Sequence, residues 1–333
     1  MNWRQQIQLN QRKTYALIVS FLCLYVLLGV LVLWMLNPYL SLRGLWSVLQ
    51  EPSSQYFISI FMGIAIVITL VGVLFGGRLS LSGTDAYQLR GDESEIELKA
   101  LYNIVEEMKI ASGLNYMPKV YVMNVGYLNA FAAGWNEKNA LIAVTRPLIR
   151  ALNRDELQAV VAHEMSHIKH YDIRVMTLLS VMSGLIVMGL DVLFHAVRPG
   201  RHQRRSKKQD ASGLLVVVII LARMIIPLIT ALMVLYVSRK RELMADAGCV
   251  ALTRDNQALA KALVKIHKRH THHQDAAKEA YAATKNEGMR SLAYIYSPKA
   301  SNIKNIWNMN DWFSTHPSLE QRLEALGVSK DDL

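Results

Sequence analysis

Two histidines and a glutamate stand close together in the stretch VVAHEMSHIKHYD, residues 160–172. His163 and His167 are four residues apart, so on a helix both imidazoles lie on one face, one turn from each other. That spacing lets them bind one zinc ion, while Glu164, about 100° round the helix, can address the open coordination position. Zinc lowers the pKa of a water molecule and polarises a carbonyl group, and a glutamate can move the proton. The pattern therefore predicts metal-assisted hydrolysis.

The pattern HExxH fixes only three positions, so a surface helix that carries two histidines is the alternative. A second stretch, SRKRELMAD at residues 238–246, places Glu242 and Asp246 on one helical face. We expect Glu242 to be the third ligand of a single zinc ion per chain. Asp246 is expected to accept a hydrogen bond from the far ring nitrogen of His163 and to fix its tautomer. A solvated acidic face is the alternative, but the neighbours of this pair are small and apolar.

The chain of 333 residues is 52% apolar and 19% charged, which indicates hydrophobic segments joined to ordinary polar ones. Four apolar runs approach the roughly 20 residues that cross a hydrocarbon core: 14–36, 56–76, 175–196 and 213–237. The first two are free of charge and predict transmembrane helices, although a cleaved signal peptide is the alternative for the first. The third contains Asp191 and the fourth Arg223 and Pro227. For these two, a helical hairpin that lies partly in the interface or on the catalytic domain is the alternative to two further spans.

The basic residues near the first apolar runs predict the orientation of the chain. Arg4, Arg12 and Lys13 precede the first run, whereas the loop 37–55 carries only Arg43. The N-terminus and the region that begins at residue 78 are therefore expected in the cytoplasm. Because the two histidines and Glu242 must meet, the third and fourth runs cross the membrane twice or not at all. A full crossing would place the basic loop 198–208 outside, against the positive-inside rule, and the sequence leaves this open.

The net charge of +11 suits an anionic surface. With long apolar runs present, an anionic lipid surface is a better partner than nucleic acid. The basic loop 198–208 has no interleaved aromatic residues, so a lipid-surface or disordered loop is favoured and no nucleic-acid partner is expected. Cys23 and Cys249 are far apart and indicate neither a disulfide framework nor a cysteine metal site.

The organisation that follows is a basic head with a transmembrane hairpin (1–77), a first part of the predicted zinc domain with the HExxH helix (78–174), a second hydrophobic hairpin (175–237) and a second part of that domain with the third ligand (238–333). Apolar spacing predicts a helix over 95–112, with Ser94 and Glu97 as its capping box. Alternation predicts short strands at 119–123, 130–133 and 140–144. Asn153 or Asp155 is expected to cap the HExxH helix.

Taken together, these motifs resemble the HtpX family of membrane zinc metallopeptidases, which is related to the CAAX prenyl proteases. The resemblance covers nearly the whole chain: two N-terminal spans, the HExxH helix, a second hydrophobic pair, the ExxxD helix and the closing THPSLEQR at 315–322. It implies a membrane α-helical plus α+β fold, in which a gluzincin-like metalloprotease domain with a small β-sheet joins up to four transmembrane helices.

The resemblance also implies roles for single residues. His163, His167 and Glu242 would bind zinc, and Glu164 would be the general base. His316 would hydrogen-bond the tetrahedral intermediate and Arg322 would orient the site. From the residues alone, the His-Pro pair at 316–317 is as well explained by a turn before a helix that Ser318 caps.

Residues 128–134, LNAFAAG, resemble the family's substrate-binding edge strand. Small residues around one phenylalanine leave room for a peptide to add as a further strand, so Asn129, Ala130, Phe131 and Ala132 are candidate substrate-binding residues. An ordinary buried strand is the alternative.

The implied activity is an endopeptidase of proteolytic quality control and stress response, which cleaves misfolded or damaged membrane proteins at a bacterial inner membrane. Polypeptides, membrane proteins above all, are the expected substrates. The rivals are a non-catalytic membrane scaffold that retains the fold, and a protease that trims prenylated C-termini.

Other histidines are expected to play no part in the metal site. His170 lies seven residues from His163, near the same helical face, but the predicted ligand set is complete without it. A second group in KIHKRHTHH, residues 265–273, has irregular spacing and cationic neighbours. We interpret these four histidines, His267, His270, His272 and His273, as a solvated helix end.

Overall fold

The computed structural model describes residues 3–36, 42–182, 240–272, 274–286, 290, 293–296 and 317–329. The fourth apolar run, most of the third, the basic loop 198–208, His273 and His316 lie outside the described residues. The α-helices of the described part are α1 (Trp3–Leu36), α2 (Leu42–Gln50), α3 (Pro52–Leu79), α4 (Ile96–Ser112), α5 (Arg146–Ala151), α6 (Arg154–Lys169), α9 (Lys240–Thr253), α10 (Gln257–His272), α11 (Gln274–Ala283) and α13 (Leu319–Leu326). Residues 172–182 are also helical.

A small mixed sheet forms the centre of the folded domain. Its strands are β1 (Tyr87–Gln88), β2 (Lys119–Met123), β3 (Ala130–Ala133) and β4 (Leu141–Thr145), in the order β1-β2-β4-β3. The β2 and β4 strands are parallel, and β1 and β3 each run antiparallel to their neighbour. The three strands predicted from alternation are present, with β4 shifted by one residue. The two-residue β1 was too short to leave a pattern.

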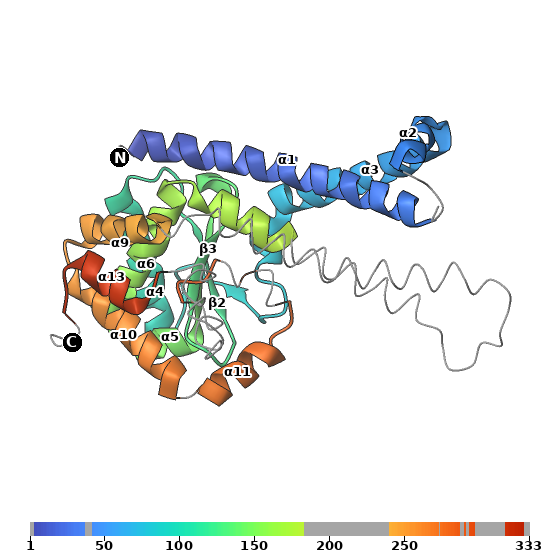
Figure 1. Cartoon of the computed structure of the whole chain (residues 1–333). Coiled ribbons are helices and arrows are strands. Elements are labelled where there is room, and N and C mark those ends of the chain that lie inside the picture. The colour runs from blue at the N-terminus through green and yellow to red at the C-terminus, as the bar shows by residue number, and fades with distance from the viewer. Residues whose placement is uncertain are drawn as a thin grey trace, which may run out of the picture.

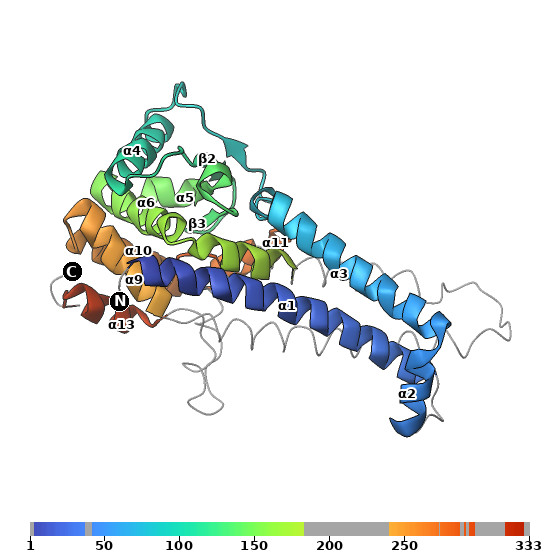
Figure 2. The same ribbon diagram turned by 90° about the horizontal axis from the view of Figure 1, so that it is seen from above.

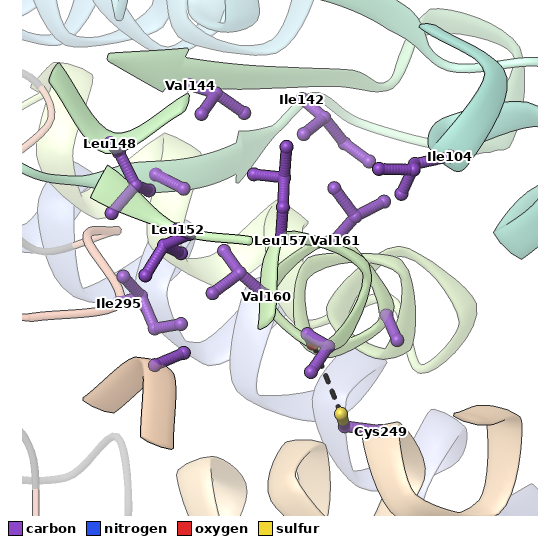
Figure 3. Close-up of a cluster of buried hydrophobic side chains, with 14 of the residues drawn as sticks. Ile104, Ile142, Val144, Leu148, Leu152, Leu157, Val160, Val161, Cys249 and Ile295 are labelled. Atoms are coloured by element: carbon purple, nitrogen blue, oxygen red, sulfur yellow. Dashed lines mark hydrogen bonds between the residues drawn. The ribbon is translucent and has the colours of Figure 1, made fainter. Parts of the chain in front are cut away.

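Both faces of the sheet are buried, so its side chains divide with a period of two. Ile142 and Val144 point to one face, where they meet Leu157, Val160 and Val161 of α6 (Figure 3). On the other face, side chains of β2, β3 and β4, with Phe131 of β3 among them, join a cluster that is rich in aromatic residues. Each large side chain buried in this way contributes about 1.5–3 kcal/mol.

The α6 helix is surrounded by other elements rather than lying on the surface. Every residue from Glu156 to Ile168 except Gln158 is buried. Its start is fixed by a capping box in which Asn153 and Glu156 bond to each other's backbone N–H. The predicted cap at Asn153 is confirmed, and the polar residues of the HExxH motif are enclosed in the domain interior.

The capping box predicted at Ser94 and Glu97 is wrong. The α4 helix begins one residue later than that box requires, with Glu95 as its N-cap and without a side-chain cap. The Glu95 carboxylate instead accepts a hydrogen bond of 2.8 Å from Arg146. An ion pair with a distant residue has taken the place of the local bond.

The α1 and α3 helices lie side by side and extend away from the sheet (Figures 1 and 2). Among the described residues, one helix is long and apolar enough to cross a membrane, namely α3, with 28 residues and a window of mean hydropathy 2.8. It buries small residues such as Ala65, Gly72 and Gly76 and exposes large ones such as Ile60 and Leu74. A helix in water does the reverse, whereas lipid favours this arrangement.

The small residues of α3 let another helix approach closely. A Cβ on Gly76 would lie 2.7 Å from Cγ2 of Thr177, and one on Gly72 would lie 3.2 Å from Cδ1 of Leu178. The helix 172–182, where the third apolar run begins, therefore packs directly on α3. Side chains from α1 complete the cluster, so the element that follows the HExxH helix is held by both N-terminal helices.

Candidate metal centre and active site

Two helices bring three ligand atoms together. His163 and His167 come from α6 and Glu242 from α9, and all three side chains are buried. The two imidazole Nε2 atoms are 3.2 Å apart, and they lie 3.6 Å and 3.7 Å from the oxygens of Glu242. Zinc bonds of about 2.0–2.1 Å in a tetrahedron require ligand atoms roughly 3.3 Å apart. The three residues therefore fit one zinc ion.

The close contact of α9 with α6 depends on a glycine. A Cβ on Gly248 would lie 2.1 Å from the Oγ of Ser166, so no larger residue fits while the helices keep their positions. The next residue, Cys249, donates a hydrogen bond of 3.1 Å to the carbonyl oxygen of Ala159 (Figure 3). These contacts hold Glu242 and Asp246 over the two histidines.

On one side of the ligand set, His163 is supported by residues of α9 and α13. Its Nδ1 lies 2.9 Å from an oxygen of Asp246. Arg322 of α13 donates two hydrogen bonds to the same carboxylate, of 2.9 Å and 2.5 Å. Burial alone would raise the pKa of Asp246, but the Arg322 charge and the His163 bond lower it to about 2. Asp246 is thus a permanent anion behind the ligand.

The carboxylates also favour a cation at His163. Burial alone would lower the pKa of this imidazole, but hydrogen bonds to Asp246 and Glu242 raise it to about 9. A site that holds a proton this firmly also suits a metal cation, because a metal competes with that proton for the same nitrogen.

On the other side, His167 is supported by a residue that sequence analysis missed. Its Nδ1 lies 3.2 Å from Oδ2 of Asp172. The α6 helix ends at Lys169, and Tyr171 adopts a left-handed conformation with φ of 59°, which brings the next residue back toward the helix. Arg241 is a second missed residue, which donates a hydrogen bond of 2.7 Å to the ligand Glu242.

Glu164 is not part of the ligand group, and its hydrogen bonding differs from that of the ligands. It is buried, and neither carboxylate oxygen has a hydrogen-bond partner of ordinary geometry among the described residues. Burial raises its pKa, although the imidazoles of His163 and His167 and the backbone of Ala132 oppose that shift. An unsatisfied buried carboxylate costs about 1–3 kcal/mol, so its presence calls for a functional explanation.

Strand β3 lies at the edge of the sheet next to α6, but part of its free edge is already paired. Tyr294 forms an antiparallel bridge with Phe131, and the N–H of Ile295 donates a hydrogen bond of 3.0 Å to the carbonyl of Ala130. The Asn129 side chain donates a bond of 2.9 Å to the carbonyl oxygen of Tyr296. Residues 294–296 thus lie against β3 through this bridge and these hydrogen bonds.

The histidines outside the ligand set differ in their burial and in their hydrogen-bond partners. His170 faces Ser166 at 3.3 Å and is not part of the ligand group found among the described residues. The prediction of a solvated helix end is wrong for His270, which is buried, shares a hydrogen bond of 3.0 Å with the carbonyl of Leu128 and stacks on Tyr296. Packing of the 294–296 segment on α10 accounts for this burial. His272 is exposed.

Two imidazoles and a carboxylate that fit one zinc ion, with a buried glutamate one residue from the first ligand, define a zinc metallopeptidase site of the HExxH type. The model of peptidase family M48 matches residues 95–329. The chain belongs to this family, and His163, His167 and Glu242 are its zinc site.

Curated relatives agree over nearly the full length. A protease HtpX homolog of Helicobacter pylori (strain Shi470) is 32% identical over 330 residues, which is 98% of both chains. The Streptococcus gordonii protease HtpX homolog is 34% identical and covers 92% of this chain and 99% of its own. Among solved structures, S. mikatae Ste24p aligns with a TM-score of 0.42 and 17% identity, over 97% of this chain and 66% of that one.

Proposed function

We propose that this M48 peptidase is a membrane-bound endopeptidase that cleaves misfolded or damaged membrane proteins at a bacterial inner membrane, as part of a stress response, with its active site facing the cytoplasm. The relatives named above are proteases. The α3 helix exposes large apolar side chains, as a helix in lipid does, and it packs on the helix 172–182 that follows the HExxH helix. This arrangement supports a substrate that is itself in or near the membrane.

The observation that carries the catalytic part of the proposal is the bonding of Glu164. A scaffold that kept zinc only for stability would have no use for a buried carboxylate that has no hydrogen-bond partner of ordinary geometry among the described residues. When bound, zinc polarises the scissile carbonyl and makes water a better nucleophile. Glu164 accepts the proton of the attacking water as a C–O bond forms, and delivers it to the leaving nitrogen as the C–N bond breaks.

Two further residues complete the proposed machinery. Arg322 is fully buried against Asp246, and its Nη1 donates a hydrogen bond of 3.0 Å to the carbonyl of Ile295. We assign to Arg322 the role of orienting Asp246, and through it His163, rather than contact with the substrate. His316 lies outside the described residues, and its role as a hydrogen-bond donor to the reacting carbonyl is proposed from the family resemblance.

The substrate is proposed to add to strand β3 at residues 129–132, with backbone hydrogen bonds that tolerate many side chains. Ala132 is the favoured contact, because its backbone lies next to Glu164. For the substrate to pair with Asn129 to Phe131 as well, residues 294–296 must first move off this edge of β3. A peptide that reaches the site is therefore expected to be extended, which suits an unfolded or damaged chain.

The direct test compares the wild type with Glu164→Gln, using an unfolded protein substrate and added zinc. General-base catalysis contributes about 10²–10⁴-fold, so cleavage by the variant is expected to fall by at least 100-fold. Zinc content must be measured in both proteins, because it shows that the variant still holds its metal. Equal cleavage by the two proteins would remove Glu164 from the mechanism.

Orientation is tested by labelling with a membrane-impermeant thiol reagent in intact cells, in a Cys23→Ser background. Cys249 is buried, and burial raises its pKa to about 12, so it does not react. A cysteine at Trp46 in α2 is expected to be labelled from outside, and one at Lys99 in α4 only after lysis. Labelling of the Lys99 position in intact cells would reverse the proposed topology.

A further inference from the structure

The α1 helix contacts the folded domain close to the zinc site. Its first three turns precede the charge-free run and lie over the folded domain rather than beyond it (Figures 1 and 2). Asn10 in this part is buried, with 3% of its surface exposed, and so is Thr14, the first residue of the run, with 2%. The Thr14 hydroxyl donates back to the carbonyl of Asn10 within the helix. The Asn10 side-chain amide donates its hydrogen bonds outside α1.

Both amide hydrogens of Asn10 go to the end of the HExxH segment. One is donated to the carbonyl oxygen of His170 at 2.9 Å, and the other to Oδ1 of Asp172. The second oxygen of Asp172 lies 3.2 Å from Nδ1 of the ligand His167. One buried carboxylate is thus shared between a zinc ligand and the N-terminal helix. An amide nitrogen has two hydrogens to donate, and both are used in this arrangement.

The physical consequence concerns the orientation of His167. A ligating imidazole is held in its tautomer and ring position by the partner of its other nitrogen, and loss of that partner commonly costs 10–100-fold in metal affinity. Asp172 is that partner here. Asp172 lies just beyond the left-handed turn at Tyr171, so the α6 helix alone does not fix its carboxylate, and the hydrogen bond from Asn10 of α1 helps to hold it.

We propose that Asn10 is a positioning residue that couples the seating of α1 on the domain to the zinc site, through Asp172 and His167. The affinity for zinc then depends on whether α1 is docked, so a chain whose N-terminal helix is displaced holds its metal weakly. The inference rests on the proposed function only through the zinc site, and it makes no use of the substrate.

The test measures zinc affinity in the full-length, detergent-solubilised protein by competition with a chelator. All variants carry Glu164→Gln, which excludes self-digestion and separates the result from peptidase activity. Asp172→Asn is expected to weaken zinc binding by 10–100-fold, and Asn10→Leu, which keeps the size of the side chain, by about tenfold. Thr14→Val removes a buried hydroxyl one turn along α1 and is expected to leave the affinity unchanged.

The combined variant distinguishes positioning from general damage. If Asn10 acts through Asp172, Asn10→Leu adds no further loss in the Asp172→Asn background. Should Asn10→Leu fail to fold, Asn10→Gln, which keeps the amide donors on a longer arm, takes its place in the same cycle with a smaller expected loss. Unchanged zinc affinity in the Asn10 variant, or equal losses in both backgrounds, would overturn the proposal.

Discussion

Two helices of this protein each carry three histidines at short spacing, and they use them differently. The α6 helix with its C-cap contributes His163, His167 and His170, and α10 contributes His267, His270 and His272. Within the described residues, only the first helix contributes to a group able to hold a metal. The α6 histidines face Glu242, Asp246 and Asp172, whereas His270 faces a carbonyl and aromatic rings.

The two helices show that burial alone does not determine the pKa of a histidine. His163 and His270 are both buried, yet the pKa of the first is raised to about 9 and that of the second is lowered. Burial lowers the pKa of both imidazoles, and only the carboxylates around His163 reverse the effect. Histidine spacing is therefore a weak sign of a metal site, and the carboxylates opposite the histidines are the decisive one.

A large effect on zinc binding is expected from removing the carboxylate behind His163. Asp246→Asn should weaken zinc binding by about 10–100-fold, since the imidazole loses its charged partner. It also leaves the buried Arg322 guanidinium without a counter-charge, so the protein should unfold more readily. Chelator competition and thermal unfolding measure the two effects. Asp155→Asn, a substitution at an exposed position of α6, is the matched control. Zinc affinity equal to the wild type in Asp246→Asn would contradict the claim that carboxylates decide which histidines bind metal.

The contact that brings the carboxylates to α6 is tested by Gly248→Ala. The added methyl group would lie 2.1 Å from Oγ of Ser166, so α9 must shift outward. Overpacking of this kind costs about 1–3 kcal/mol, and the shift also moves Glu242 from the histidines. Unfolding free energy and zinc affinity should both fall.

Two further variants sharpen this result. Adding Ser166→Ala, which removes the clashing hydroxyl, should restore part of the loss. Gly63→Ala on α3, where the new methyl group meets nothing within 4 Å, should have no such effect. A Gly248→Ala protein with unchanged zinc affinity would show that close helix contact is not what positions the carboxylates.

The smallest effect concerns pH and the other histidine helix. The pKa of His270 is lowered from 6.5 by burial, with a further contribution from His267. Its stabilising contribution is therefore complete above pH 6.5 and is lost as the pH falls below that value. His270→Phe should flatten the decline of unfolding free energy between pH 7 and pH 5 while zinc content stays unchanged. His272→Phe, at an exposed position, should keep the wild-type slope, and an equally steep decline in His270→Phe would contradict the assignment.

Much of the site could be predicted because it is encoded in helical spacing. His163 and His167, like Glu242 and Asp246, are four residues apart, and each pair shares a face whatever the rest of the chain does. The cap at Asn153 is equally local. The predicted box at Ser94 is absent: α4 begins one residue later, and Glu95 at its N-cap pairs with Arg146, 51 residues away.

The rest depends on tertiary contacts that leave no periodic signal. Asp172 lies five residues after His167, which is off the ligand face of a continuous helix, and only the left-handed turn at Tyr171 returns it. Asn10 bonds to it across 162 positions. The pairing of residues 294–296 with β3, which buries His270, likewise joins segments far apart in the chain.

The central claim is that zinc is held by the histidines of α6 together with a carboxylate of α9, and it is tested most directly by metal content. The zinc bound per chain should be measured in the purified wild type, in Glu242→Ala, and in a protein with both His267→Ala and His272→Ala. We expect one zinc ion per chain in the wild type and in the α10 variant, and almost none in Glu242→Ala. A full zinc ion in Glu242→Ala, or loss of zinc from the α10 variant, would contradict the account.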